Sequence, residues 1–270
     1  MPLNKSFIRW AGAKSWLVPD VQNMLKGLDI NNYHEPFMGG ASIFFSLNLQ
    51  RESYLSDVNA ELVNAFVCVK ENCDSVIEIL KTWDTDEESY YKIRASESSD
   101  LITQAARFLY LNANSYNGLY RVNRSGHYNV PYGKRNIEVD YERLKRASQQ
   151  LTSTIIKCQD FRESLIYIRP KDFVFLDPPY TVSKDKNGFI AYNQNLFSLD
   201  DQRRLCEFVG ELNRIGAYYV LTNAAHETIE QIFQDVGIKK EMERNSLIGG
   251  RNSFRGKIKE FIFTNIPERR

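Results

Sequence analysis

The stretch Phe173-Val174-Phe175-Leu176-Asp177-Pro178-Pro179-Tyr180 gives the clearest indication of the fold. Its first four residues form a continuous apolar run, which is typical of a strand buried on both faces of a parallel sheet. The two prolines cannot continue that strand, because each fixes one φ angle and lacks a backbone donor. In an open α/β sheet, ligands bind beyond the carboxyl ends of the strands. The stretch therefore predicts a buried strand that ends in a functional site.

The tetrapeptide at its end combines hydrogen-bond acceptors with an aromatic ring. The Asp177 carboxylate and the Pro178 carbonyl only accept hydrogen bonds, and Tyr180 offers a flat face for stacking. This arrangement suits an exocyclic amino group on a planar ring. Binding both N–H groups withdraws the nitrogen lone pair from conjugation and directs it at an electrophile. Asp177, Pro178 and Tyr180 are therefore the candidate catalytic residues.

Strands and helices alternate on both sides of this stretch, up to about residue 60 and again after about residue 150. Ser198 and Asp201 resemble a capping box that opens a helix, and Gly216 is a stop signal for it. The alternation predicts an α/β fold with a mostly parallel, twisted sheet and helices on both faces. The expected strands are 33–35, 53–56, 173–176, 217–222 and 261–263, and the expected helices are 15–27, 42–49, 199–214 and 227–234.

The middle third of the chain has a different pattern. From residue 59 to about 114 the apolar residues recur almost throughout at helical spacing. Residues 115–135 are rich in turn formers, and we expect 128–130 to pair with 120–122 in a hairpin around Arg124-Ser125-Gly126. The pattern predicts one domain formed by 1–60 and 150–270, with 61–149 inserted into it as a helical and hairpin domain.

Two further motifs lie near the N-terminus. Glu35-Pro36-Phe37-Met38-Gly39-Gly40-Ala41-Ser42 is a glycine turn between a strand and a helix, where backbone can approach a ligand closely. Asp57 ends the next strand, near the spacing at which an acid binds ribose hydroxyls, although Gly-x-Gly-x-x-Gly is absent. Phe7-Ile8-Arg9-Trp10-Ala11-Gly12-Ala13-Lys14 places an aromatic and a cation beside a flexible turn.

Composition excludes several classes of protein. The 270 residues carry 35 Lys+Arg against 34 Asp+Glu, which excludes a histone-like or tail-driven nucleic-acid binder and an acidic disordered chain. No apolar run is long enough to span a membrane, and the opening residues lack the apolar run of a signal peptide, so we expect a cytoplasmic protein. The four cysteines form no Cys-x-x-Cys pair, so we expect no metal.

The motifs together resemble one family over essentially the whole chain, the Dam-type DNA adenine-N6 methyltransferases, which depend on S-adenosylmethionine. The order of glycine motif, recognition segment and catalytic tetrapeptide is also that of this class. Two positions depart from the family pattern, because Ala13 and Ala41 stand where the family has glycine; we expect a tighter turn there. The resemblance is carried by residues 9–14, 36–40, 55–59, 116–121, 129–133 and 177–180.

The resemblance implies a Rossmann-like fold, with 1–60 and 150–270 as the catalytic domain that binds S-adenosylmethionine and 61–149 as the target-recognition domain. Asp177 would contact both the methyl donor and the target amino group, and Tyr180 would stack on the extruded adenine. The other residues implied to bind the methyl donor are Trp10, Lys14, Phe37, Gly39, Gly40 and Asp57.

DNA recognition is expected mainly in the hairpin, because a two-stranded ribbon fits the major groove. The resemblance implies that Arg121 reads guanine and that Tyr116 fills the gap left by the flipped base, although Tyr120 is an alternative wedge. Residues 121–135 and 244–259 hold four and five Lys/Arg and no acid, whereas 71–100 hold nine acids and three bases. The candidate DNA-binding residues are Arg9, Tyr116, Asn117, Leu119, Arg121, Arg124, Pro131, Lys134, Arg251 and Arg255.

The expected reaction is methylation of adenine N6 in double-stranded DNA at GATC or a related site, by base flipping and direct transfer. Methylation of RNA adenine or a protein amide, and a catalytically silent DNA-binding relative, stay open as alternatives. Loops 246–256 and 181–197, the latter with Tyr192, are expected to close on DNA. We expect a monomer without membrane attachment in a bacterial or phage-infected cell, associated with the nucleoid, and a cognate restriction endonuclease sharing the site without a stable complex.

Overall fold

The computed structural model describes residues 5–123, 125–181, 197–245 and 257–268. The chain divides into two compact units. Unit 1 comprises Met1–Val18 and Met38–Asp160, and unit 2 comprises Pro19–Phe37 and Phe161–Arg270. The predicted division into 1–60 with 150–270 and 61–149 is a functional one, and it remains a prediction.

Seven strands form one mixed sheet in the order β3-β2-β1-β4-β5-β7-β6. The pairs β2–β3, β1–β4 and β4–β5 are parallel, and β7 runs antiparallel to β5 and β6. This arrangement confirms the predicted α/β class with a mostly parallel sheet. The strands are β1 (Tyr33–Glu35), β2 (Ser53–Asp57), β3 (Thr154–Cys158), β4 (Phe173–Leu176), β5 (Tyr218–Ala224), β6 (Ile238–Asn245) and β7 (Lys257–Thr264).

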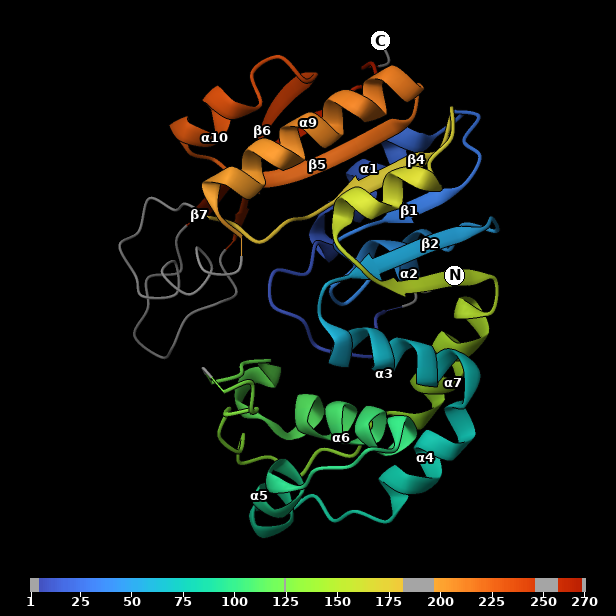
Figure 1. Cartoon of the computed structure of the whole chain (residues 1–270), viewed down its shortest axis with the longest axis vertical. Coiled ribbons are helices and arrows are strands. Elements are labelled where there is room, and N and C mark those ends of the chain that lie inside the picture. The colour runs from blue at the N-terminus through green and yellow to red at the C-terminus, as the bar shows by residue number, and fades with distance from the viewer. Residues whose placement is uncertain (1–4, 124, 182–196, 246–256, 269–270) are drawn as a thin grey trace. The chain divides into compact units, whose positions relative to one another are not determined.

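In unit 2 the strand β4 lies between β1 and β5, and all four of its residues are buried. This burial explains the continuous apolar run in the sequence. The helix α9 (Leu199–Ile215) begins with the predicted capping box of Ser198 and Asp201 and ends at Gly216 in the left-handed region. It packs against β5, as Figure 1 shows. The remaining helices of unit 2 are α1 (Val18–Leu25), η3 (Phe161–Ile166) and α10 (Glu227–Ile232). The first residue of α1, Val18, is still part of unit 1.

In unit 1 the parallel strands β2 and β3 pair with Leu55 opposite Ile156. The helices α3, α4, α6 and α7 form one packed group beside them, coloured teal to yellow-green in Figure 1. This group confirms the helical pattern of the middle third. The helices of unit 1 are η1 (Ser15–Leu17), α2 (Ser42–Leu47), α3 (Ala60–Glu71), α4 (Cys73–Lys81), α5 (Glu87–Ala95), α6 (Leu101–Asn114), η2 (Tyr116–Gly118) and α7 (Tyr141–Leu151).

The strands β3 and β6 were not predicted, and they are the two edges of the sheet. Five of the eight residues of β6 are charged, so the segment lacks the apolar pattern of a buried strand. Charged side chains are favoured on edge strands, because they discourage pairing with another chain. The predicted hairpin is present only in part, because among the described residues its arms are joined by an isolated bridge between Val122 and Tyr128 and by a backbone hydrogen bond from Asn129 N–H to the Arg121 carbonyl at 3.0 Å, rather than by two full strands.

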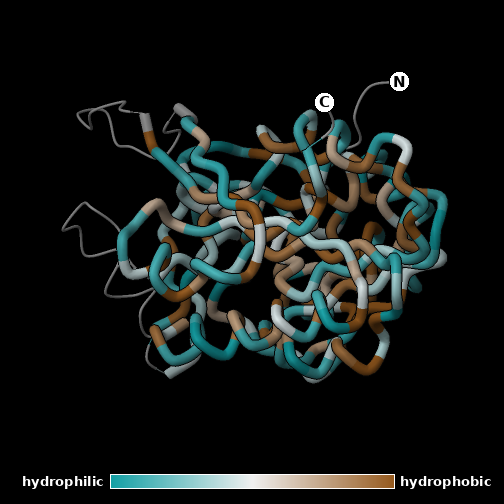
Figure 2. Tube along the Cα trace, turned by 90° about the horizontal axis from the view of Figure 1, so that it is seen from above, coloured by the Kyte–Doolittle hydropathy of each residue, from teal (hydrophilic) through white to brown (hydrophobic). Residues whose placement is uncertain are grey.

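Hydrophobic stretches along the chain are short and are interrupted by hydrophilic ones, as Figure 2 shows. Accordingly, no helix among the described residues is both long enough and apolar enough to cross a membrane.

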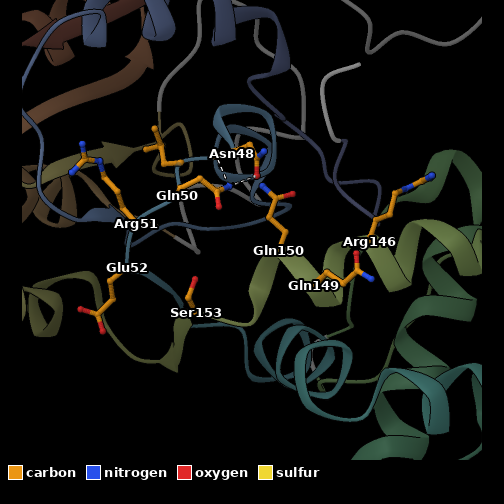
Figure 3. A pocket seen from close by; sticks show the side chains of 9 residues that line it. Asn48, Gln50, Arg51, Glu52, Arg146, Gln149, Gln150 and Ser153 are labelled. Carbon is orange, nitrogen blue, oxygen red and sulfur yellow. Dashed lines mark hydrogen bonds between the residues drawn. The ribbon is translucent and has the colours of Figure 1, made fainter. Parts of the chain in front are cut away.

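Unit 1 also contains a polar pocket of about 670 Å³, which Figure 3 shows from close by. The Gln150 side chain beside it donates hydrogen bonds to the carbonyls of Phe44 and Phe45, at the end of α2. None of the site residues predicted from the sequence lines this pocket. The residues that line it are Asn48, Leu49, Gln50, Arg51, Glu52, Arg146, Gln149, Gln150 and Ser153.

Candidate functional site

The glycine turn of unit 1 lies directly against the indole of Trp10. Gly39 adopts a φ of +44°, and a Cβ atom placed there would lie 2.7 Å from Trp10 Cδ1. At Gly40 a Cβ atom would lie 2.9 Å from Trp10 Cβ. Only glycine permits this close approach. The structure therefore brings together Trp10, Gly39 and Gly40, which the sequence places thirty residues apart.

Asp57 ends β2 and faces the same turn. Its carboxylate accepts hydrogen bonds from the backbone N–H of Gly39 at 3.1 Å and of Asn59 at 3.0 Å. Burial raises the pKa of Asp57, although backbone N–H groups lower it again in part. The carboxylate thus fixes the turn and remains an acceptor of the kind that binds ribose hydroxyls.

Lys14 lies buried at the start of η1. Its Nζ donates to the carbonyl of Gly12 at 2.9 Å, and its backbone N–H donates to Ser42 Oγ at 3.1 Å. The departure at Ala13 needs no special backbone, because its φ is not positive. Ala41, by contrast, is held at a φ of +49°, a left-handed conformation that costs about 1–2 kcal/mol for an L-residue. The tighter turn expected at these two alanines stays a prediction.

Asn112 of α6 connects Arg9 to the recognition segment. The Asn112 side chain accepts from the Arg9 backbone N–H and donates to the Arg9 carbonyl, both at 2.8 Å. It also donates to the carbonyl of Gly118 at 3.3 Å. A Cβ atom at Gly118 would lie 2.5 Å from Arg9 Cδ, so the Arg9 side chain crosses this glycine closely. Arg9 and the segment around Gly118, which were both predicted to bind DNA, are thereby joined in unit 1.

The two candidate wedge tyrosines differ in environment. Tyr116 exposes half of its surface (50%) at the start of η2. Tyr120 stacks on Trp10 with ring centroids 5.6 Å apart, and its hydroxyl donates to Glu61 Oε2 at 2.7 Å. A ring that is already stacked and hydrogen-bonded is a poor wedge, so these environments favour Tyr116.

Arg121 is exposed and is held by one neighbour across the partial hairpin. Its Nε donates to Asn129 Oδ1 at 2.7 Å, and one Nη donates to the Asn129 carbonyl at 3.3 Å. Asn117, Pro131 and Lys134 are exposed, and Leu119 is half-buried. Several predicted DNA contacts and both predicted loops lie outside the described residues: Arg124, Tyr192, Arg251, Arg255 and the segments 182–196 and 246–256.

The tetrapeptide after β4 is tied to two neighbouring strands of unit 2. Thr222 of β5 donates to Asp177 Oδ1 at 2.7 Å, and the Tyr180 hydroxyl donates to Glu260 Oε2 of β7 at 2.7 Å. Burial, followed by the charges of Asp177 and Glu260, raises the pKa of Tyr180 well above its usual range. Tyr180 therefore stays a neutral phenol, and Asp177 accepts the hydrogen bond of Thr222.

The residues on either side of the tetrapeptide are fixed as well. Thr181 accepts a hydrogen bond from Gln202 at 3.0 Å, and Gln202 in turn accepts one from Asn223 at 2.8 Å, all three being buried. Phe37 stacks on Phe161 with centroids 5.1 Å apart in the same unit. These contacts place Phe37 and the tetrapeptide on rigid elements of unit 2.

Sequence reasoning missed four residues that hold the predicted ones. Asn112 has a detectable signal, because it is a polar residue at an apolar position of the α6 pattern. Asn129 lies in the stretch 129–133 that carries the family resemblance, although no role was predicted for it. Thr222 and Glu260 have no such signal, because each is a common residue in a strand. The four are Asn112, Asn129, Thr222 and Glu260.

The sequence matches the family of D12 class N6 adenine-specific DNA methyltransferases over residues 10–247. The chain belongs to this family, which confirms the predicted resemblance. It is 34% identical to the type II methyltransferase M1.LlaDCHI of Lactococcus lactis subsp. cremoris, over 97% of this chain and 95% of that protein. It is likewise 34% identical to the type II methyltransferase M.MjaIII of Methanocaldococcus jannaschii, over 90% and 92%.

The DNA adenine methylase of Escherichia coli K12 is 32% identical, over 85% of this chain and 83% of that protein. These relatives place the chain among adenine-specific DNA methyltransferases. Within the described residues, no group of three or more His, Cys, Asp or Glu side chains is arranged to hold a metal ion.

Proposed function

We propose that this protein methylates adenine N6 in double-stranded DNA at GATC sites, with S-adenosylmethionine as the methyl donor. The observation that carries this proposal is the tetrapeptide after β4, where the Asp177 carboxylate accepts a hydrogen bond from Thr222 and the Tyr180 hydroxyl donates one to Glu260. An oriented acceptor and a flat ring suit a purine amino group. Family membership supplies the reaction class and the DNA substrate.

The residues of unit 1 fit the proposed methyl donor. The Gly39–Gly40 backbone leaves no room for side chains beneath Trp10, and Asp57 offers a carboxylate for ribose hydroxyls. Trp10, Lys14, Gly39, Gly40 and Asp57 are the residues of this unit that would hold the donor. When bound, S-adenosylmethionine supplies an electrophilic methyl group, which the target nitrogen takes up directly without a covalent enzyme intermediate.

The residues of the tetrapeptide act on the target amino group. Asp177 and the Pro178 carbonyl accept its N–H bonds, so the nitrogen lone pair is withdrawn from the ring. No strong base is needed, because the amino group loses its proton after transfer, and Asp177 acts mainly by orientation. Tyr180 stacks on the flipped adenine, which returns about 1–3 kcal/mol of the few kcal/mol that flipping costs.

The recognition segment of unit 1 supports reading of duplex DNA. Exposed Tyr116 is suited to fill the gap left by the flipped base, as apolar wedges do in DNA-kinking proteins. Arg121, steadied by Asn129, is suited to bind guanine through two hydrogen bonds. We further propose that residues 61–149 form the target-recognition domain and that the protein acts as a monomer in the cytoplasm, sharing its site with a restriction endonuclease.

Offering radiolabelled S-adenosylmethionine with duplex DNA, RNA and protein tests this proposal. We expect label on duplex adenine only, and resistance of treated plasmid to nucleases that are blocked by GATC methylation. Label on RNA or protein instead of DNA would contradict the substrate, and DNA labelled outside GATC would contradict the site.

Asp177→Ala is the matching variant. It should abolish methylation, because it removes the acceptor that polarises the amino group, while binding of duplex measured by fluorescence anisotropy stays largely intact. Asp235→Ala, which changes an exposed acid between α10 and β6, away from the tetrapeptide, is the control. Normal turnover of Asp177→Ala would overturn the role given to Asp177.

A further inference from the structure

Glu260 is a carboxylate in the interior of unit 2. It belongs to β7, opposite Ala224 of β5 and Met242 of β6, and its exposed fraction is 0%. Burial of a charged carboxylate is costly unless strong hydrogen bonds compensate for the lost water. An apolar residue of similar size would fill this position at lower cost. The presence of a glutamate therefore needs a reason beyond packing.

The hydrogen bond from Tyr180 provides such a reason. The Tyr180 hydroxyl and Glu260 Oε2 are 2.7 Å apart, which is the distance of a strong, charge-assisted bond. A phenolic O–H prefers the plane of its ring, so the direction of the acceptor also restricts rotation of the ring. Because burial and nearby charge raise the pKa of Tyr180, its hydroxyl keeps the proton and remains the donor.

Orientation matters more for Tyr180 than for an ordinary core tyrosine. A stacking ring must present its face at one angle, and small errors at a reacting centre lower rates considerably. The neighbouring anchors follow the same principle, since Thr222 holds Asp177 and Gln202 holds Thr181. The residue that anchors Tyr180 differs from Thr222 and Gln202 in being a fully buried carboxylic side chain.

We propose that Glu260 is a positioning residue for methyl transfer, which holds the Tyr180 ring in the orientation that receives the target adenine. The inference rests on the function proposed above. Glu260 acts through Tyr180 and does not itself contact the base. Its removal is therefore expected to lower kcat with little change in binding of the methyl donor.

Steady-state methylation of a GATC duplex tests the inference with Glu260→Gln, Glu260→Leu, Tyr180→Phe and the double variant. Glu260→Leu and Tyr180→Phe should each lower kcat by about 10- to 100-fold, the loss expected for one hydrogen bond to a charged group. The double variant should be no slower than either single one. Glu260→Gln should stay within about threefold of the wild type, because its amide oxygen still accepts.

Tyr219→Phe is the control, because the buried Tyr219 hydroxyl donates to the Val236 carbonyl within the same unit, and neither residue belongs to the proposed site. It should lower the melting temperature as Tyr180→Phe does, but leave kcat unchanged. The inference would be overturned if the fold losses in kcat of Glu260→Leu and Tyr180→Phe multiplied in the double variant. It would also be overturned if Glu260→Leu lowered the melting temperature but left kcat unchanged. If Glu260→Leu does not fold, wild-type kcat in Tyr180→Phe would overturn it equally. Absence of methyl transfer by the wild type would instead overturn the proposed function.

Discussion

Gly39 illustrates how one missing side chain shapes the proposed donor site. Its φ of +44° and its contact with Trp10 are both incompatible with a Cβ atom. The neighbouring Ala41 tolerates a left-handed conformation with a methyl group, so strain alone does not demand glycine in this turn. What distinguishes Gly39 is therefore the indole that lies against it.

Gly39→Ala should displace the Trp10 indole and weaken binding of S-adenosylmethionine by at least about tenfold, or 1.4 kcal/mol. The left-handed backbone adds a loss of about 1–2 kcal/mol in the free energy of unfolding. Isothermal titration calorimetry and chemical denaturation measure the two effects. Gly210→Ala is the control, because Gly210 lies in α9 with open space around its Cα, and it should gain about 0.5–1 kcal/mol of stability. Unchanged donor affinity in Gly39→Ala would contradict the proposed site.

At the scale of elements, the partial hairpin is held by its surroundings as well as by its own pairing. Among the described residues one isolated bridge joins its two arms, and the Val130 carbonyl accepts hydrogen bonds from Tyr90 at 2.9 Å and Arg94 at 3.0 Å, both on α5. The hydroxyl of Tyr128 also donates to the Leu119 carbonyl at 2.6 Å. Long-range side-chain bonds thus replace a regular ladder and leave the Arg121 side chain on the surface.

Arg121→Ala should relax sequence discrimination at one base pair by about 1–3 kcal/mol, because a bidentate contact to guanine would be lost. The measurement is kcat/KM on GATC duplexes and on duplexes substituted at each position. Arg214→Ala, which changes an exposed arginine of α9 paired with Glu211, should leave discrimination unchanged. A uniform loss of affinity at every sequence would mark Arg121 as a phosphate contact instead.

At the scale of the whole molecule, the formal charge of +1 is the sum of unlike segments. Helices α4 and α5 lie within residues 71–100, which carry nine acids and three bases, whereas 121–135 carry four bases and no acid. A near-neutral total limits non-specific attraction to DNA, because that attraction depends on the number of phosphates neutralised. The basic segment 121–135 can nevertheless bind the phosphate backbone of DNA.

The salt dependence of duplex binding tests this distribution. The logarithm of affinity should fall linearly with the logarithm of salt concentration, with a slope of about 0.9 per neutralised phosphate. Lys134→Ala should reduce the slope by about one, whereas Lys81→Ala, in the acidic segment on α4, should leave it unchanged. Equal effects of the two substitutions would indicate that net charge rather than the hairpin governs binding.

Helices and strands could be predicted from the sequence where interactions between residues close in the chain determine them. The buried run of β4, the capping box of α9 and its glycine stop were all predicted, because each depends on residues only a few positions apart. The edge strands β3 and β6 were missed, because an edge strand need not bury both faces and so carries no continuous apolar run.

The prediction of the candidate site likewise came from the sequence, since an Asp-Pro-Pro-Tyr after a buried strand presents a carboxylate, a carbonyl and an aromatic ring beside each other. The partners of those groups were decided by the tertiary structure. Glu260 lies eighty residues from Tyr180, and Asn112 lies 103 residues from Arg9. No local pattern records which distant residue a folded chain brings near, because that depends on the path of the whole backbone. The candidate residues of the site could therefore be proposed from the sequence, whereas the distant residues that form hydrogen bonds with them could not.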